Sequence, residues 1–417
     1  MWKEYKLEEL LSYEQPGAYI VNSTDYNDAY DTPVLTAGKS FILGYTNEKE
    51  GVFDRLPVII FDDFTTASQF VNFKFKVKSS AMKILHINSE LVVPKYIFYR
   101  MQVINIEHST HKRYWIQHYS KIKIKVPPKA EQERIVSCIE ELFSSLDNAV
   151  ETLNKTKKQL EVYRQAVLKK AFEGNYTIEW RKCNEVSADF FFHVLELKRR
   201  EKGNKSKYDL LEKIDLPHIP EKWKWVCIGD IAVKPEYGTS KKSLKEGKIP
   251  VLRMGNMKDG SIDWSDLAYS NDEEDNIKYK LHDQDVLFNR TNSSEHVGKT
   301  SIFKGDRDAI YAGYIIRINQ LPEINAQYLT YFMNSFVAKQ YGKRVKTDGV
   351  NQSNINGKKL MSYPFPLCAR DEQDRIVYEI ESRLSMCDSI EQTVNTALNE
   401  AEAMRQSILK EAFEGRL

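Results

Sequence analysis

A long stretch of this chain occurs twice, 241 positions apart. Aligning Glu131 with Glu372 places EQERIVSCIEELFSSLDNAV over EQDRIVYEIESRLSMCDSIE, and the alignment continues without a gap to Gly174 and Gly415. Of the 44 aligned pairs, 20 are identical, whereas ordinary amino-acid usage gives roughly one match in twenty by chance. A repeat of this length marks a structural unit, so the chain is predicted to build the same element twice.

Both copies are predicted to be long helices, each with one apolar stripe. The stripe residues are spaced four and three apart, which is typical of a coiled coil. No Gly or Pro interrupts either copy before Gly174 and Gly415, which stand where a helix C-cap favours glycine. The simplest way to bury both stripes is to pair the two helices with each other; the alternative is that each stripe packs on its own neighbouring domain. The predicted stripe residues are Ile135, Ile139, Leu142, Leu146, Ala149, Leu153, Thr156, Leu160, Tyr163 and Val167, and then Ile376, Ile380, Cys387, Ile390, Val394, Ala397, Ala401, Met404 and Ile408.

The composition, with 41% hydrophobic residues, is that of an ordinary soluble chain. No apolar run reaches the ~18 residues of a membrane span, and the opening MWKEYKLEELL is too charged for a signal peptide. Five scattered cysteines without a CxxC pair favour a reducing cytoplasm and argue against a zinc site or a disulfide framework. The net charge is only +2, so a nucleic-acid binder would have to concentrate its basic residues on one face.

Two blocks with matching landmarks remain once the repeats are removed. Each opens with Trp-Lys (Trp2, Trp223), continues through a PVL strand that runs to a glycine, and then has an apolar strand in VIIFDD or DVLFNR. Short strands, turns and few helices favour α+β globules. The predicted order is a first domain at 1–130, a central helix at 131–180, a linker and second domain at 181–371, and a distal helix at 372–417.

These motifs resemble the specificity (S) subunit of type I restriction–modification systems over essentially the whole chain. The resemblance lies in the duplicated EQxRIV…AFEG helices, in LPHIPEKWKWVCIGDIA at 216–232, and in PVLTAGKSFILGYTN, VIIFDDFTT and FKVKSSAMKIL of the first block. It implies an α+β chain with an internal pseudo-twofold repeat. Two target-recognition domains would each read half of a bipartite double-stranded DNA site, and an antiparallel coiled coil of the two helices would set their separation.

The resemblance also implies partners. The helices would dock two methyltransferase (M) subunits, and restriction (R) subunits would join the full complex. S-adenosylmethionine, ATP and magnesium would belong to those partners, so the chain itself is expected to bind no cofactor, to do no chemistry and to avoid membranes.

The nucleotide-binding and methyltransferase motifs agree with a chain that is not an enzyme. The only Pro-Pro, Pro127-Pro128, lacks the flanking residues of an adenine-N6 methyltransferase motif, and no GxGxxG loop is present. The GKT at 298–300 resembles a phosphate-binding loop, but Ser293 stands where that loop needs glycine.

Three further patterns are each interpreted as structural. Ser80 and Lys83 have the S-x-x-K spacing of an activated serine, but Lys83 is interpreted as a solvated residue of an alternating strand. Histidines at 108, 111 and 118 lack a carboxylate or cysteine at metal-ligand spacing, so no metal site is expected. Asp62 and Asp63, followed by Lys74 and Lys76, only loosely resemble a nuclease core.

Specific DNA recognition needs polar side chains at base edges and cations or amides at phosphates. In the first block the candidates are Lys39, Phe64, Thr65, Thr66, Lys76, Lys78, His111, Lys112, Arg113, Gln117 and His118. In the second block they are Arg253, Asn256, Arg290, Asn292, Ser293, Lys299, Lys343, Arg344, Lys346, Asn351, Gln352 and Asn354. Tyr114 and Trp115 are either DNA contacts or core aromatics, and for any single lysine the alternative is a solvated surface charge.

Two functions therefore stand. The first is a sequence-specific DNA-binding subunit that directs methylation and restriction by its partners. The second is a structural adaptor that bridges proteins through its coiled coil. Salt dependence separates them, because phosphate contacts give DNA binding a steep salt slope and protein bridging does not require one.

Overall fold

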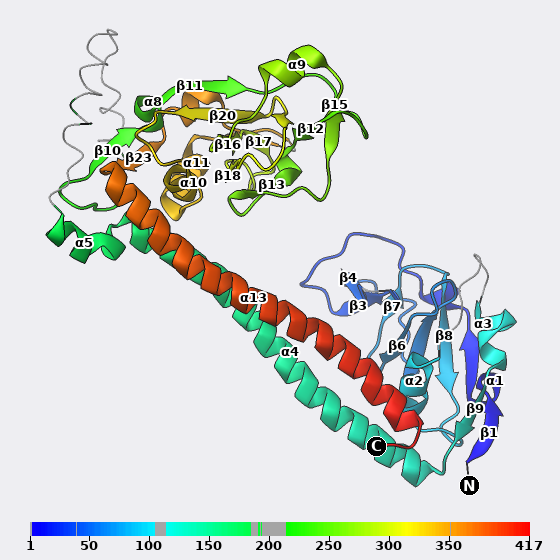
Figure 1. The fold of residues 1–417 in the computed structure, drawn as a ribbon. Helices are drawn as coiled ribbons and strands as arrows, with labels where there is room; N and C mark the ends of the chain where they lie inside the picture. Colours follow the sequence, from blue (N-terminus) through cyan, green and yellow to red (C-terminus); the bar gives the residue numbers. More distant parts are fainter. Residues whose placement is uncertain are drawn as a thin grey trace. The chain divides into compact units, whose positions relative to one another are not determined.

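The computed structural model describes residues 2–38, 40–104, 114–184, 191, 193, 214–350 and 352–417. It divides into two compact units, one formed by Met1–Lys155 with Val394–Leu417 and the other by Thr156–Thr393. Each unit holds one globule and one part of each of two long helices, α4 (Lys129–Phe172) and α13 (Arg370–Phe413) (Figure 1). None of the described helices is long and apolar enough to cross a membrane.

The first globule contains three small sheets. The strands of the largest run antiparallel in the order β2-β8-β5-β6, the second has the order β4-β3-β7, and β1 pairs with β9. Short helices α1 (Leu7–Leu10), α2 (Pro94–Gln102) and α3 (Tyr114–Gln117) complete it. The strands are β1 (Lys3–Lys6), β2 (Leu11–Glu14), β3 (Thr32–Leu35), β4 (Ile42–Thr46), β5 (Val58–Asp62), β6 (Ser68–Val71), β7 (Lys76–Val77), β8 (Met82–Ile87) and β9 (Lys123–Val126).

The second globule repeats this arrangement. Its largest sheet has the order β11-β20-β16-β18, its second β15-β12-β19, and β10 pairs with β23. In both globules the middle strand of the three-stranded sheet pairs antiparallel with one neighbour and parallel with the other. The strands are β10 (Lys224–Cys227), β11 (Ala232–Tyr237), β12 (Ile249–Leu252), β15 (Ala268–Ser270), β16 (Val286–Asn289), β18 (Thr300–Ile302), β19 (Ile310–Tyr311), β20 (Ile315–Gln320) and β23 (Pro364–Leu367). The shared topology supports the interpretation of the two blocks as distant relatives.

The central strands β5 and β16 are apolar on both faces because both faces are covered. Ile59 and Phe61 of β5 face a core that includes α2 and the long helices, whereas Val58 and Ile60 face a second core formed with the smaller sheet. In β16, Val286 and Phe288 point to the core that contains α10 (Ala326–Met333), and Leu287 points to the opposite core. The polar residues that follow these strands therefore emerge from a rigid base.

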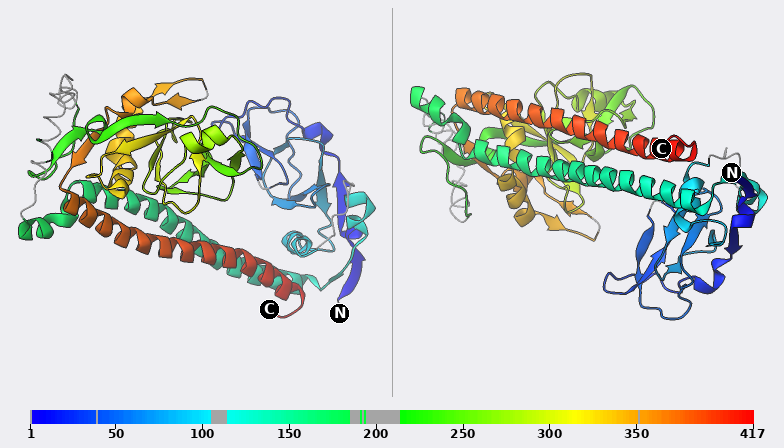
Figure 2. Two further views of the ribbon diagram at one scale, coloured as in Figure 1. Left: turned by 45° about the horizontal axis from the view of Figure 1, so that its top comes forward. Right: turned by 90° about the horizontal axis from the view of Figure 1, so that it is seen from below.

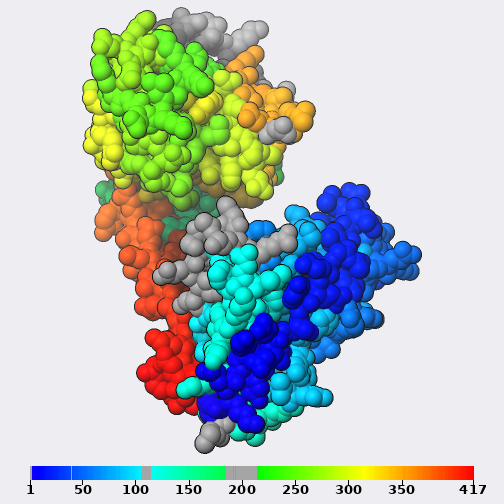
Figure 3. All heavy atoms as spheres, turned by 90° about the vertical axis from the view of Figure 1, so that its right-hand side faces the viewer, coloured from blue at the N-terminus to red at the C-terminus, as the bar shows by residue number. Residues whose placement is uncertain are grey.

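In the first unit, α4 and α13 run antiparallel. Asp147 of α4 pairs with Arg405 of α13, and Arg134, nearer the start of α4, donates a hydrogen bond to the carbonyl oxygen of Leu417 at 3.1 Å. The final turns of α13 also enter the core of the first globule, where the rings of Tyr96 and Phe413 lie 5.4 Å apart. Figure 3 shows this red end of α13 against the blue and cyan globule.

The second unit pairs the other halves of the same helices in the same way, and the two helices run side by side (Figure 2). Arg164 of α4 lies 2.6 Å from Asp388 and 3.0 Å from Glu391 of α13. Arg164 and Arg405 are equivalent positions of the repeat, as are Asp147 and Asp388. The ion pairs in the two units are therefore pseudo-twofold copies of each other, which confirms the predicted antiparallel pairing.

The predicted stripe needs a correction. Leu142, Tyr163, Ile390 and Met404 are 37, 49, 42 and 54% exposed, and Ala149 is exposed as well, so the predicted stripe is not buried at these positions. Phe143, one position later than Leu142, is buried, and Arg164 replaces Tyr163 in the contact with α13. A straight α-helix has 3.6 residues per turn and drifts ~20° per heptad from a strict 3.5-residue repeat, so the contact stripe moves by one residue along each helix.

Each long helix has a buried glutamine in its first turn that ties the helix to its globule. Gln132 accepts a hydrogen bond from the backbone N–H of Val93 at 2.7 Å and donates to the carbonyl of Pro127 at 2.8 Å. Gln373, its equivalent, accepts from Asn325 at 2.9 Å and donates to Cys368 at 3.0 Å. At the other end, Gly174 and Gly415 have φ of +72° and +74°, which confirms the predicted glycine caps.

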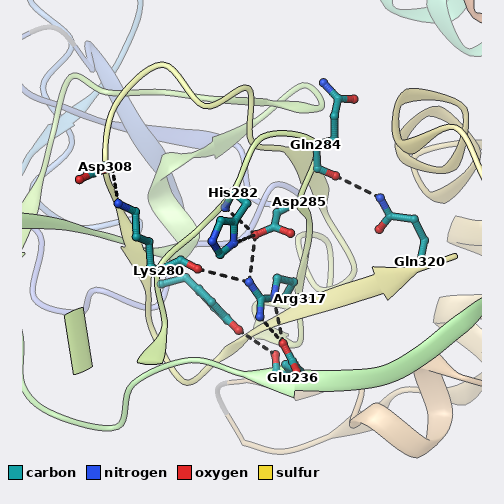
Figure 4. Close-up of polar contacts among 9 residues, drawn as sticks. Glu236, Lys280, His282, Gln284, Asp285, Asp308, Arg317 and Gln320 are labelled. Atoms are coloured by element: carbon teal, nitrogen blue, oxygen red, sulfur yellow. Dashed lines mark hydrogen bonds and ion pairs between the residues drawn. The ribbon is translucent and has the colours of Figure 1, made fainter. Parts of the chain in front are cut away.

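A largely buried ion cluster in the second globule connects β11, β20 and the residue that precedes β16. Arg317 of β20 lies between Glu236 of β11 and Asp285, which precedes β16 (Figure 4). Its Nε donates to Glu236 at 3.0 Å and its Nη1 donates to Asp285 at 3.1 Å. Burial alone would raise the pKa of Glu236, but hydrogen bonds from Arg317 and Lys234 outweigh burial and lower it. The cluster holds β11 and β20 in register at the base of the candidate site.

Candidate nucleic-acid interface

Two stretches of the second block that were predicted to contact DNA meet in one small sheet. β17 (Thr291–Asn292), which follows β16, pairs with β22 (Ser353–Asn354), and β22 pairs with β21 (Thr347–Asp348). The amide nitrogen of Asn354 donates to the Thr291 hydroxyl at 2.7 Å. This sheet brings Thr291 and Asn292 next to Ser353 and Asn354, although some 60 residues separate the two pairs in the chain.

Arg290 lies between β16 and β17, next to this sheet. Its backbone N–H donates to Tyr314 at 3.1 Å and its carbonyl accepts from Ile355 at 2.8 Å. The guanidinium carbon lies 5.1 Å from the ring centre of Tyr237, a cation–π contact. Its buried Nε has no hydrogen-bond partner among the described residues. In the described part of the chain the guanidinium stacks on an aromatic ring and has no carboxylate within ion-pair distance, which leaves its charge available for a ligand.

The other candidates around this sheet fall into two groups. Ser293, Lys343, Arg344 and Gln352 are exposed, and Asn292 is half-buried, so these side chains remain accessible. Lys346 is already engaged, because its Nζ lies 2.5 Å from Asp348 and 2.6 Å from the Ser294 hydroxyl. Lys346 therefore connects the sheet, through Asp348, to the loop that contains Ser294.

Asn256 and Arg253 differ from the expectation for DNA contacts. Asn256 is buried, accepts a hydrogen bond from the backbone N–H of Arg253 at 2.9 Å, and donates to the carbonyls of Asp263 and Asp266. It shapes the turn η4 (Met254–Asn256) and does not belong to an accessible surface. Arg253 is partly exposed but pairs with Asp266 at 3.0 Å.

The first globule places its candidates at the corresponding point, the end of β5. The carboxylate of Asp62 accepts hydrogen bonds from the backbone of Phe64 and Thr65 at 2.8 and 2.9 Å, and Thr66 has φ of +59°. A non-glycine residue in that region costs on the order of 1–3 kcal/mol, and such strain clusters at functional sites. The turn presents Phe64, 45% exposed, and Thr65 to solvent.

Helix α3 lies beside this turn because Asp63 binds its first residues. The backbone N–H of Trp115 donates to the Asp63 carboxylate at 2.8 Å, and that of Tyr114 donates to the Asp63 carbonyl at 3.0 Å. Tyr114 and Trp115 are buried, which settles these aromatics as core residues. Gln117 and Ile116 are exposed on the same helix, so the FTT turn and α3 present both polar and apolar side chains to solvent.

The candidate lysines of the first block differ in their exposure to solvent. Lys76 is 2% exposed, lies 3.0 Å from Glu48 and donates to the carbonyl of Glu50 at 2.6 Å, so it is built into the fold and is not accessible to DNA. Lys78 is exposed. Lys39, His111, Lys112, Arg113 and Asn351 lie outside the described residues.

The catalytic alternatives find little support in the geometry. Lys83 was expected to be solvated, but it is 3% exposed and lies 3.5 Å from Asp63, because both faces of β8 are covered. Ser80 is exposed in a turn, whereas Lys83 is held by Asp63 and Gln15. Among the described residues, no three His, Cys, Asp or Glu side chains converge as metal ligands do.

Tyr237 is the residue at this surface that the sequence did not single out. It belongs to β11, more than 50 positions before Arg290, and reaches Arg290 only because the sheet forms. The Tyr237 hydroxyl also accepts a hydrogen bond from the backbone N–H of Gly357 at 2.9 Å. An added Cβ at Gly357 would lie 2.8 Å from that oxygen, so glycine is needed for the approach. No local pattern in the sequence could have predicted this contact.

Comparison with known families shows which family the chain belongs to. Residues 1–162 and 220–400 match the family model described as type I restriction modification DNA specificity domain. This chain belongs to that family. The duplicated match follows the duplicated architecture, with one family domain for each globule and its adjoining helix.

Curated relatives from this family are similar over part of their length. The EcoR124I/EcoR124II specificity subunit of Escherichia coli is 42% identical over 43% of this chain and 47% of its own length. The EcoKI specificity subunit of Escherichia coli strain K12 is 26% identical over 72% and 58%. The putative MjaX specificity subunit of Methanocaldococcus jannaschii is 31% identical over 50% and 49%. The chain thus spans about half the length of the curated relatives it matches.

A solved structure shares the fold. A chain from a study of complex assembly and conformational transition of the type I restriction–modification system superposes with a TM-score of 0.68. The superposition covers 100% of this chain and 98% of that chain at 15% identity. At this identity the likeness supports the architecture of paired globules and helices, and nothing finer.

Proposed function

We propose that this chain is the sequence-specific DNA-binding subunit of a type I restriction–modification complex. Each globule reads one part of a bipartite duplex site, and the helix pair sets the separation of the two parts. The observation that carries this is the equivalent placement of polar loops at the ends of β5 and β16, in two globules of one topology. Family membership supports the same function.

Chemistry on the DNA is assigned to partner subunits. Methyltransferase subunits would supply S-adenosylmethionine-dependent adenine methylation, and restriction subunits would use ATP and magnesium, all in the cytoplasm. The long helices carry exposed apolar side chains at equivalent positions of the repeat, Tyr163 and Met404, which are 49 and 54% exposed. Two equivalent surfaces suit two copies of one partner, because identical subunits need identical contacts.

Selection from a random duplex library with the purified full chain tests the DNA assignment. The expected result is a split motif, two specified blocks around an unread spacer of fixed length. Affinity for that site should fall steeply with salt, since each neutralised phosphate adds about 0.9 to the slope of log K against log salt. Enrichment of no motif together with a flat salt response would instead favour the protein-bridging adaptor.

Arg290→Ala is expected to weaken binding by about 1–3 kcal/mol and to relax only the half-site read by the second globule, because an arginine held without a carboxylate partner suits a base edge. The matched control is Arg307→Ala, since the Arg307 guanidinium also stacks on an aromatic ring, 4.5 Å from Trp264, but lies outside the proposed interface. Site selection with each variant gives the answer. Equal loss at both half-sites, or none, would contradict a base contact.

A further inference from the structure

A cavity of 720 Å³ opens beside the proposed base-reading sheet of the second globule. One wall is helix α11 (Phe336–Val345), which contributes Lys339 and Lys343. The other wall is the loop that follows β17, including Ser294 and Glu295. The cavity therefore continues directly from the loop that carries Asn292 and Ser293.

Three lysines gather at this cavity without an ion-pair partner in the described part of the chain. Lys339 and Lys343 are one helical turn apart on α11, and Lys299 follows Gly298, which lines the cavity. Some other lysines of the same globule have such a partner. Lys241, Lys248, Lys258, Lys280 and Lys346 each lie within ion-pair distance of an aspartate or glutamate.

Lys339 lies close enough to the other two lysines for their charges to affect it. Burial lowers the pKa of the Lys339 ammonium, Asp259 opposes that effect, and the positive charges of Lys299 and Lys343 lower the pKa further. Glu295 is an exposed carboxylate in the lining and pairs with none of the three in the described structure. Positive charges held close together around a cavity attract a ligand of opposite charge.

We infer that Lys299, Lys339 and Lys343 bind the phosphate backbone of the DNA half-site that the second globule reads. This inference rests on the proposed function. Cations from two elements around an open cavity suit successive phosphates, whereas the neighbouring Arg290 and Asn292 suit base edges. Phosphate contacts fix position on the duplex without reading sequence, so these lysines hold the second globule in register while the adjacent sheet reads.

The test is the full chain with Lys299, Lys339 and Lys343 all replaced by glutamine. Binding to the selected split site is measured from 50 to 200 mM salt. Removing three phosphate contacts should make the slope of log K against log salt less steep by about 2–3, so that over this range the variant loses roughly 40-fold less affinity than the parent. The selected motif should stay the same, and the melting temperature should not fall, since like-charge repulsion is removed.

The control removes the same charge from the long helix α4. Lys155→Gln, Lys158→Gln and Lys170→Gln together change exposed lysines without altering the proposed interface, so the salt slope should match that of the parent. A parental slope in the Lys299, Lys339 and Lys343 variant would overturn the inference and leave the proposed function intact. A parent that shows no salt-dependent DNA binding would overturn both.

Calorimetry with inorganic phosphate distinguishes a site for free phosphate from a contact to the DNA backbone. If phosphate bound the parent but not the triple variant, while the DNA salt slopes of the two proteins were equal, the cavity would be a site for free phosphate, and the DNA assignment would be wrong. The expected result is the reverse pattern, with a changed DNA slope and no phosphate binding at millimolar concentration.

Discussion

Replacing Arg317 with methionine is expected to lower the free energy of unfolding of the second globule by about 3 kcal/mol, because it leaves two largely buried carboxylates without their cation. The Arg317, Glu236 and Asp285 side chains are 15, 22 and 18% exposed, so water can compensate only in part. Hydrogen–deuterium exchange of β11, β16 and β20 peptides in urea, read by mass spectrometry, measures the loss in this unit separately from the other.

The pH dependence of this effect follows from the lowered pKa of Glu236, whose ordinary value is 4.5. A carboxyl whose folded pKa is depressed stabilises the protein above its unfolded pKa and loses that contribution as the pH falls through the folded value. The difference between wild type and Arg317→Met should therefore be full at pH 6 and shrink below pH 4.5. A difference that stayed constant down to pH 3 would show that lost packing dominates.

Lys248→Met is the control, since Lys248 and Glu273 form an exposed pair at 3.4 Å with side chains 67 and 82% exposed. Pairs of this kind contribute on the order of 0–1 kcal/mol. A loss at Lys248 equal to that at Arg317 would mean that burial is not the source of the effect.

Glu372→Ala is expected to destabilise the second unit by about 3–5 kcal/mol, because it removes one partner of a buried ion pair. The Glu372 carboxylate accepts hydrogen bonds from Thr177 at 2.7 Å, Arg181 at 2.6 Å and the Trp223 indole at 2.8 Å. It thereby joins the start of α13 to the segment after α4 and to the strand that opens the second globule. Thermal unfolding, together with exchange in peptides covering 174–183 and 223–227, measures the loss.

The repeat supplies its own control, since Glu131 occupies the equivalent position. Its side chain is 37% exposed and pairs with Arg134 on the same helix at 2.9 Å. Glu131→Ala should leave the unfolding of the first unit unchanged within error. Glu372→Gln should lie between wild type and Glu372→Ala, because an amide still accepts one hydrogen bond. Equal losses at Glu131 and Glu372 would refute the role of the buried cluster.

Much of the architecture could be predicted from local patterns. Helix length, the uninterrupted repeats and the glycine caps at Gly174 and Gly415 depend on residues close together in the chain, and the structure confirms them. The apolar central strands β5 and β16 could be predicted for the same reason. The two interface stretches around Arg290 and Gln352 were identified separately, but their pairing through β17 and β22 was not.

The errors at the candidate site residues concern partners that are distant in the chain. Lys76, Lys83 and Asn256 were interpreted as surface residues because polar residues in short strands and turns are usually exposed. Each is instead buried against a partner: Glu48 for Lys76, Asp63 for Lys83, and turn carbonyls for Asn256. A partner of this kind leaves no periodic signal, because the fold alone brings the two segments together.

The sequence by itself determined that this chain contains one helix design twice and that both copies are glycine-capped, since these properties follow from spacing within a single segment. Only the tertiary structure decided how identical residues at equivalent positions of the repeat differ in their contacts. Glu131 and Glu372 stand in the same EQxRIV motif, yet one is a partly exposed surface residue and the other is enclosed by Thr177, Arg181 and Trp223. The physical reason is that the energy of a charge depends on its burial and on the groups around it, and segments far along the chain supply both.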